Sequence, residues 1–141
     1  MNFEVKISYE KVCEDGIREK VSETYLVDAL SFTEAEGRII EEMKPYISGE
    51  FGIVVIKRAN FAELFLNDKS GDRFYKVKIN MITLNEKSGA ERRQAVYMLV
   101  NANDIQSAKD SLIEGMKGSM ADYEIESVSE TKILDFFPYK A

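Results

Sequence analysis

Hydrophobic and polar residues alternate at the start of the chain, and the same alternation returns in its second half. Every second residue is apolar in Phe3–Tyr9 and again in Tyr75–Met81. Alternation with a period of two, in segments rich in aromatic and β-branched residues, predicts strands with one buried face. Each segment is followed by a glycine-containing turn signal and a second apolar stretch, which ends at Ala29 and at Ala102. Each pair of segments is therefore predicted to form a β-hairpin.

After each predicted hairpin, the apolar residues recur with the spacing of an α-helix. Ser31 and Asp104 are good N-cap residues, and Glu34 completes a capping box with Ser31. Pro45 is predicted to end the first helix, because proline has no amide hydrogen to donate. Gly118 is predicted to end the second helix, because glycine readily adopts the positive φ found just after a helix. The apolar residues in between have the spacing of one helical face. They are Phe32, Ala35, Ile39, Ile40 and Met43 in the first helix, and Ile105, Ala108, Leu112, Ile113 and Met116 in the second.

The rest of each half is predicted to be extended. A third strand is expected at 50–58 and at 122–129, where apolar and β-branched residues recur. The final segments, 60–66 and 132–138, have a spacing that fits either a short strand or one helical turn. We expect strands, because both segments are short and rich in aromatic and aliphatic residues.

The two halves are therefore copies of one unit. Repeat one covers 2–66 and repeat two covers 74–138, with 66–73 as the connector. Leu26–Ala29 aligns with Leu99–Ala102 in the best-matched block. This pattern predicts an α+β fold, built as a tandem internal repeat of β-β-α-β(-β) units within a single domain, 1–141. We expect a mainly antiparallel sheet with both helices on one face, a shared core and a pseudo-two-fold axis.

Composition narrows the class of protein. The chain has 141 residues, an ordinary size for one domain, and a net charge of −6 that lies mostly in the first copy. Acidic proteins are repelled by phosphate backbones, so nucleic-acid binding is possible but not favoured. No apolar run reaches membrane-spanning length, and the start lacks the pattern of a secretory signal. We therefore expect a cytoplasmic protein with no membrane association.

Candidate chemistry is sparse. The chain has no histidine and one cysteine, Cys13, which excludes histidine triads, histidine metal ligands and an internal disulfide. It also has no nucleophile-elbow or phosphate-loop motif. Glu41 and Glu114 occupy equivalent positions and could form a carboxylate pair, but such residues more often belong to a solvated helix surface. We therefore predict no catalytic residue, no cofactor-binding residue, no metal site and no enzymatic activity.

Several apolar residues fall out of phase with the core and are predicted on the sheet face away from the helices. Such a patch is rarely left bare, which favours contact with a second copy or another protein. The alternative is that the last segment of each copy covers it, or that the sheet curls like a barrel. The preferred hypothesis is a non-enzymatic binding or scaffold protein that self-associates. Its predicted interface residues are Leu26, Val54, Ile56, Ile82 and Leu99.

A second hypothesis uses the basic residues of the second copy. An aromatic ring and several cations on one sheet surface could bind single-stranded nucleic acid by stacking and phosphate contacts. Ordinary cross-strand pairing with acids such as Glu91 explains the same residues more simply. The candidate residues are Lys76, Lys78, Arg92, Arg93 and Tyr97. On this hypothesis the chain would be an accessory protein of a phage or mobile element.

Several segments also carry a family resemblance. They are Phe3–Lys6, Tyr25–Glu36, Ile47–Phe51, Gly115–Gly118 and Met120–Tyr123. In these segments the chain resembles a small uncharacterised bacterial and phage-associated family known only as a domain of unknown function. The resemblance covers nearly the whole chain. It implies a compact cytoplasmic protein and brings no catalytic residue with it.

Overall fold

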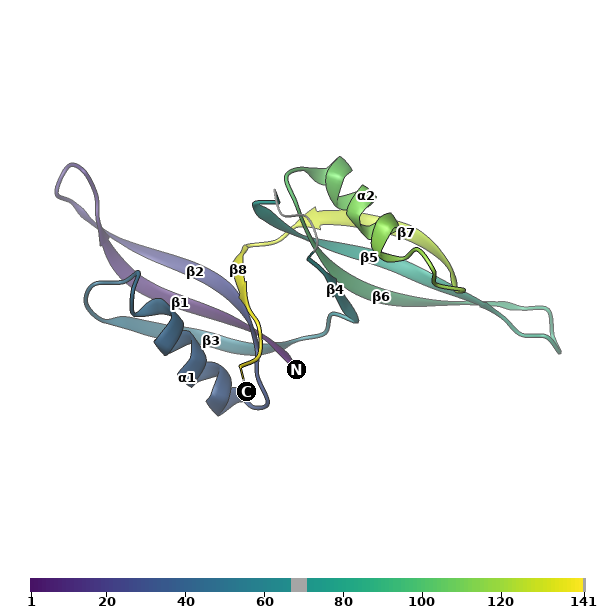
Figure 1. Ribbon diagram of the computed structural model, residues 1–141, viewed down its shortest axis with the longest axis horizontal. Coiled ribbons are helices and arrows are strands. Elements are labelled where there is room, and N and C mark those ends of the chain that lie inside the picture. Colours follow the sequence, from purple (N-terminus) through teal and green to yellow (C-terminus); the bar gives the residue numbers. More distant parts are fainter. Residues whose placement is uncertain (67–70, 141) are drawn as a thin grey trace. The chain divides into compact units, whose positions relative to one another are not determined.

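The structure is a computed structural model that describes residues 1–66 and 71–140 (Figure 1). It divides into two compact units. The first unit combines Met1–Ala59 with the C-terminal segment that begins at Lys132, and the second unit is Asn60–Thr131. Residues 67–70 of the predicted connector lie outside the described residues.

The first unit is a four-stranded sheet with one helix. Strands lie in the order β3-β1-β2-β8; β1 is antiparallel to β2 and β3, and β8 is parallel to β2. Helix α1 lies against one face of this sheet (Figure 1). The elements are β1 (Asn2–Val12), β2 (Arg18–Asp28), α1 (Phe32–Met43), β3 (Phe51–Ala59) and β8 (Ile133–Phe137).

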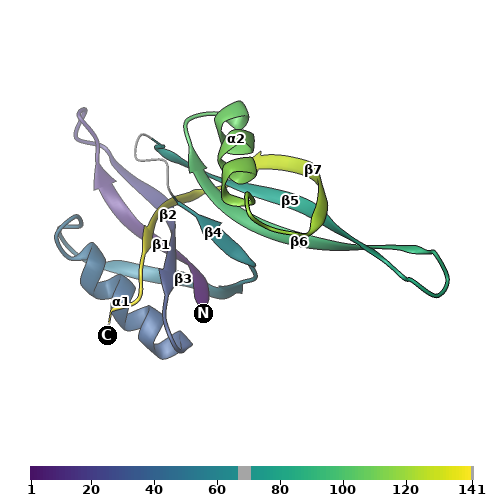
Figure 2. The ribbon, with the colours of Figure 1, turned by 45° about the vertical axis from the view of Figure 1, so that its right-hand side comes forward.

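The second unit has the same plan. Its strands lie in the order β4-β6-β5-β7, with β5 antiparallel to β6 and β7, and β4 parallel to β6. Helix α2 packs on one face of this sheet, as the turned view also shows (Figure 2). The elements are β4 (Glu63–Phe65), β5 (Arg73–Leu84), β6 (Glu91–Ala102), α2 (Ile105–Gly115) and β7 (Asp122–Glu130).

The last strand of each copy joins the sheet of the other copy. Strand β4 follows β3 in the chain but pairs with β6, and β8 follows β7 but pairs with β2. The register is equivalent in the two sheets, because Leu64 lies opposite Leu99 and Phe136 lies opposite Leu26. The prediction of strands within 60–66 and 132–138 is confirmed. Their exchange between the two sheets was not predicted.

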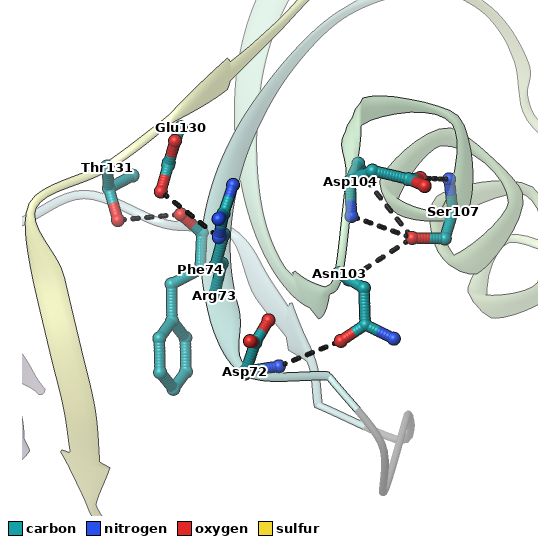
Figure 3. A network of polar contacts seen from close by, with 8 residues as sticks. All are labelled: Asp72, Arg73, Phe74, Asn103, Asp104, Ser107, Glu130 and Thr131. Atoms are coloured by element: carbon teal, nitrogen blue, oxygen red, sulfur yellow. Dashed lines mark hydrogen bonds and ion pairs between the residues drawn. The ribbon is translucent and has the colours of Figure 1, made fainter.

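Both predicted helix starts are confirmed. The Ser31 hydroxyl accepts from the Glu34 amide at 3.1 Å. In α2, the Asp104 side chain accepts from the Ser107 amide at 2.7 Å, and the Ser107 hydroxyl accepts from the Asp104 amide at 3.1 Å, which closes a capping box (Figure 3). The hydrogen bond from the Ser107 amide to the Asp104 carboxylate is the main cause that holds the pKa of this carboxylate below its ordinary value.

A second set of contacts fixes the point where the chain leaves the second unit. The hydroxyl of Thr131 donates to the carbonyl oxygen of Phe74 at 2.8 Å (Figure 3). The Thr131 amide donates to the same oxygen at 2.9 Å. Next to them, Arg73 and Glu130 form an ion pair in which Nε and Oε1 are 3.8 Å apart. Strand β8 begins two residues later, at Ile133.

Each sheet buries its own core beneath its own helix. The first cluster includes Phe3, Val5, Ile7 and Ile39, and the second includes Tyr75, Val77, Ile79 and Leu112. The α+β class is confirmed, with equivalent elements recurring in each sheet. The expectation of one sheet carrying both helices over a shared core is wrong. The exchanged strands complete two separate sheets, so each helix has a sheet of its own to cover.

Candidate functional site

The face of each sheet that turns away from its helix is called here the outer face. On the first sheet, strand pairing arranges the outer-face residues in rows that run across the strands. One row contains Val55, Lys6, Thr24 and Ile133, from β3, β1, β2 and β8. The neighbouring row contains Lys57, Glu4, Leu26 and Phe136. The exchanged strand β8 thus supplies the last residue of both rows.

A cavity of about 510 Å³ lies over these rows, and we call it the lysine pocket. This volume is within the range of sites that bind small molecules. Its lining combines three lysines, one carboxylate, two hydroxyls and two aliphatic side chains. The residues are Glu4, Lys6, Ser22, Thr24, Val55, Lys57, Lys132 and Ile133.

The charges of the lysine pocket are unbalanced. Lys57 forms an ion pair with Glu4 at 3.2 Å, which satisfies the one carboxylate in the lining. Within residues 1–66 and 71–140, Lys6 and Lys132 form no ion pair. Both side chains are exposed. The pocket therefore presents two ammonium groups without a counter-charge, next to hydroxyls that can donate hydrogen bonds.

The second sheet fills the equivalent place with its own side chains. Lys78 is the counterpart of Lys6, and it lies opposite Tyr97, the counterpart of Thr24. The ammonium nitrogen of Lys76 lies 5.3 Å from the centre of the Tyr97 ring, within the range of a cation–π contact. An aromatic ring under a cation thus replaces the small Thr24 hydroxyl of the first sheet.

The two sheets also differ in the negative charge next to the central lysine, which is Lys6 in the first sheet and Lys78 in the second. In both sheets one extra residue bulges from the third strand beside the central lysine: Val54 in β3 and Glu126 in β7. Glu126 forms a 2.8 Å ion pair with Lys78 and raises the pKa of that lysine. In the first sheet the bulged residue is an exposed valine, which cannot pair with Lys6. The residue at the bulge therefore neutralises Lys78 in the second sheet and leaves the charge of Lys6 uncompensated in the first.

Four of the five residues predicted for nucleic-acid binding share the outer face of the second sheet. They are Lys76, Lys78, Tyr97 and Arg93, as the pairing of β5 with β6 shows. Arg92 immediately precedes Arg93 on β6 and turns to the opposite face. Arg93 forms a 2.7 Å ion pair with Glu124 and a 3.9 Å pair with Glu91.

The residues predicted as an interface are placed less uniformly. Leu26 and Leu99 are fully buried, so they offer no exposed apolar surface. Ile56 was predicted on the outer face, but it packs on the core under α1, because the bulge at Val54 shifts the register of β3. Ile82 lies on the outer face and is half-buried, and Val54 is exposed. Self-association stays a prediction.

A family model for a domain of unknown function, DUF4494, matches residues 1–139. The chain belongs to this family. No curated protein and no solved structure gave a significant match. In the described part of this family member, no three or more histidine, cysteine, aspartate and glutamate side chains form a group that could hold a metal ion. None of the helices described is long and apolar enough to cross a membrane.

Other polar clusters serve the packing of the first unit. Arg38 on α1 is buried, and it donates to the carbonyl oxygen of Pro138 at 2.9 Å and to Glu42 at 3.0 Å. Lys140 also pairs with Glu42, at 3.3 Å. These contacts fasten the segment after β8 to α1. Glu41 and Glu114, the candidate carboxylate pair, are both exposed, and Glu114 pairs with Lys117 at 2.7 Å.

The lysine pocket was not among the predicted sites. Lys6 and Lys57 lie on strands that are not consecutive in the chain, and Lys132 comes from the exchanged segment. One signal was present in the sequence. The aligned copies differ in type at Thr24 and Tyr97, and at Val54 and Glu126, although their cores match. Those differences become informative only when the bulges and the strand order are known.

Proposed function

We propose that the protein is a non-enzymatic binding protein and that its ligand is a small anion held in the lysine pocket. The observation that carries this proposal is the pair of uncompensated lysines, Lys6 and Lys132, at a cavity of about 510 Å³. Charge-assisted hydrogen bonds from lysine to an oxyanion are about twice as strong as neutral ones. The Ser22 hydroxyl can add a further donor to the shell around the anion.

The comparison between the two copies supports the same proposal. In the second sheet, the carboxylate of Glu126 binds the lysine equivalent to Lys6. A negatively charged oxygen is therefore a suitable occupant beside this lysine in the geometry of the unit. The first sheet has Val54 in place of the glutamate, so that occupant has to come from solution.

A calorimetric titration with ribose 5-phosphate tests the proposal, using the full chain. Lys6→Met removes one ammonium group and should weaken binding about tenfold, because a hydrogen bond to a charged group contributes about 1.5–3 kcal/mol. Lys11→Met is the matched control, because Lys11 is an exposed lysine on the same strand, outside the pocket lining. It should bind like the unchanged protein. Absence of binding, or equal loss in both variants, contradicts the proposal.

The second candidate function is the binding of single-stranded nucleic acid, as an accessory protein of a phage or mobile element. The contact between Lys76 and Tyr97 favours it, because an aromatic ring beside a cation is a typical stacking platform. The ion pairs of Lys78 with Glu126 and of Arg93 with Glu124 disfavour it, since both cations are already neutralised. Titration of a labelled oligonucleotide at low salt, with Tyr97→Ala as the variant, decides this question.

A further inference from the structure

The second sheet shows which chemical groups fit over the outer-face row in this fold. Two groups occupy the neighbourhood of Lys78: the Glu126 carboxylate, at 2.8 Å from its ammonium nitrogen, and the Tyr97 ring directly across the strand pair. One group is an oxyanion and the other is aromatic. The ring also lies 5.3 Å from a second ammonium group, that of Lys76.

Both groups are missing at the equivalent positions of the first sheet. Thr24 stands where the ring would be, and Val54 stands where the carboxylate would be. The central lysine is kept as Lys6. Replacement of a tyrosine by a threonine removes the volume of a whole aromatic ring, and the lysine pocket extends over that place.

The first sheet also provides an apolar neighbour and a cation for an aromatic ring. The Ile133 side chain, which is 4% exposed, lies next to Thr24 in the row and gives the ring an apolar edge. In the second sheet the cation is Lys76 on β5. Its counterpart on β1 is the acidic residue Glu4, and the residue opposite Glu4 on β3 is Lys57, so the cation of the first sheet lies on the neighbouring strand. Lys57 lines the pocket and can lie over a ring bound there.

We infer that the ligand of the lysine pocket combines an aromatic ring with an anionic group, as a nucleoside monophosphate does. The ring takes the place over Thr24 that Tyr97 fills in the second sheet. The anionic group binds Lys6 and Lys132, where the second sheet uses Glu126 for the equivalent of Lys6. This inference rests on the proposed function, and it adds the class of ligand.

The ring and the anion make separable contributions. An aromatic ring buries a large apolar area and gains from a nearby cation, so its removal should cost affinity even when the phosphate is kept. We expect adenosine monophosphate to bind at least about tenfold more tightly than ribose 5-phosphate, a difference of about 1.4 kcal/mol. Adenosine, which lacks the anion, should also bind at least about tenfold more weakly than the monophosphate.

The test is a calorimetric titration of the full chain with these three compounds, repeated with Thr24→Tyr. This substitution places in the first sheet the side chain that its counterpart carries, so the fold tolerates it at the equivalent position. It should weaken adenosine monophosphate at least about tenfold and ribose 5-phosphate by less than about threefold. Thr83→Tyr is the matched control, because Thr83 is an exposed threonine on β5, outside the pocket lining.

The outcomes separate the inference from the proposed function. Equal affinity for adenosine monophosphate and ribose 5-phosphate overturns the inference and leaves a simple anion site. Equal affinity for adenosine and its monophosphate overturns both, because the lysines then contribute nothing. If none of the three compounds binds, both are likewise overturned. An unchanged affinity for the monophosphate in Thr24→Tyr overturns the placement of the ring and with it the inference.

Discussion

Lys6 lies directly opposite Thr24 on the outer face of the first sheet, in the same register that places Lys78 opposite Tyr97 in the second. The lysine is common to the two copies, and its neighbours are not. In the second copy a ring and a carboxylate surround the lysine, whereas the first copy has a cavity there. The duplication therefore produced two equal cores and two unequal outer faces.

The bulge residue should control the charge of the lysine pocket. Val54→Glu places a carboxylate beside Lys6, as Glu126 stands beside Lys78. Binding of ribose 5-phosphate should fall at least about tenfold, because the carboxylate competes with the ligand for the ammonium group. The free energy of unfolding should change by less than about 0.5 kcal/mol, since the site is exposed. Unchanged binding in calorimetry would show that Lys6 does not hold the anion.

Gly115 tests the position of strand β4. A Cβ atom added at Gly115 would lie 2.6 Å from the ring of Phe65, which is buried beneath α2. Gly115→Ala should therefore destabilise the protein by about 1–3 kcal/mol in urea unfolding. Gly37→Ala is the matched control, because its added Cβ would meet no atom within 4 Å in the middle of α1. That substitution should stabilise the protein, by up to about 1 kcal/mol.

Phe137 tests the exchange of β8 into the first sheet. Its ring stacks on Tyr25 of β2 at a centroid distance of 5.6 Å and packs on the core under α1. Phe137→Ala should lower the free energy of unfolding by about 1–3 kcal/mol, by loss of apolar burial and of the ring contact. Leu134→Ala, on the same strand but 53% exposed, should change it by less than about 0.5 kcal/mol. Equal effects would mean that β8 does not pack as described.

Glu42 predicts a pH dependence of stability. The hydrogen bond from Arg38, together with Lys140, lowers the pKa of Glu42 in the folded protein. Because the folded pKa lies below the unfolded one, the ionised group stabilises the fold above the ordinary glutamate pKa, and this contribution is lost as the pH falls through the folded value. Glu42→Gln should therefore lower the melting temperature near neutral pH, and the difference from the unchanged protein should shrink at acid pH. A difference that grows on acidification would contradict this sign.

The exposed neighbour Glu41 provides the control for that measurement. It lies on the same helix, so Glu41→Gln makes an identical chemical change at a position that is open to solvent. Its melting temperature should follow that of the unchanged protein at both pH values. The comparison isolates the contacts of Glu42 with Arg38 and Lys140 from the general effect of removing a negative charge.

The sequence predicted local structure well because local structure depends on neighbouring residues. The alternation in Phe3–Tyr9, the caps at Ser31 and Asp104 and the strands near both ends of the repeat were all found in the structure. Strand exchange depends on pairing between distant segments, and β4 and β8 are too short to reveal their partners by pattern. The expectation of one shared core failed for this reason.

The placement of the site depended on backbone irregularities. The bulge at Val54 turns Ile56 towards the core. The pattern of apolar residues in the sequence does not reveal this bulge. Arg92 and Arg93 were grouped as one basic cluster, but adjacent strand residues turn to opposite faces. The basic candidates of the second copy lie on two consecutive strands, β5 and β6, whereas the pocket of the first copy is assembled from four strands and the segment before β8.

The central claim is that the first copy binds a ligand at a place that the second copy fills with its own side chains. Amide chemical-shift mapping by NMR during a titration with adenosine monophosphate tests it most directly. The account predicts that the largest shifts fall at Lys6, Thr24, Val55 and Ile133, with little change at Lys78 and Tyr97. Equal shifts at the two sets of positions, or shifts confined to the second set, would contradict it.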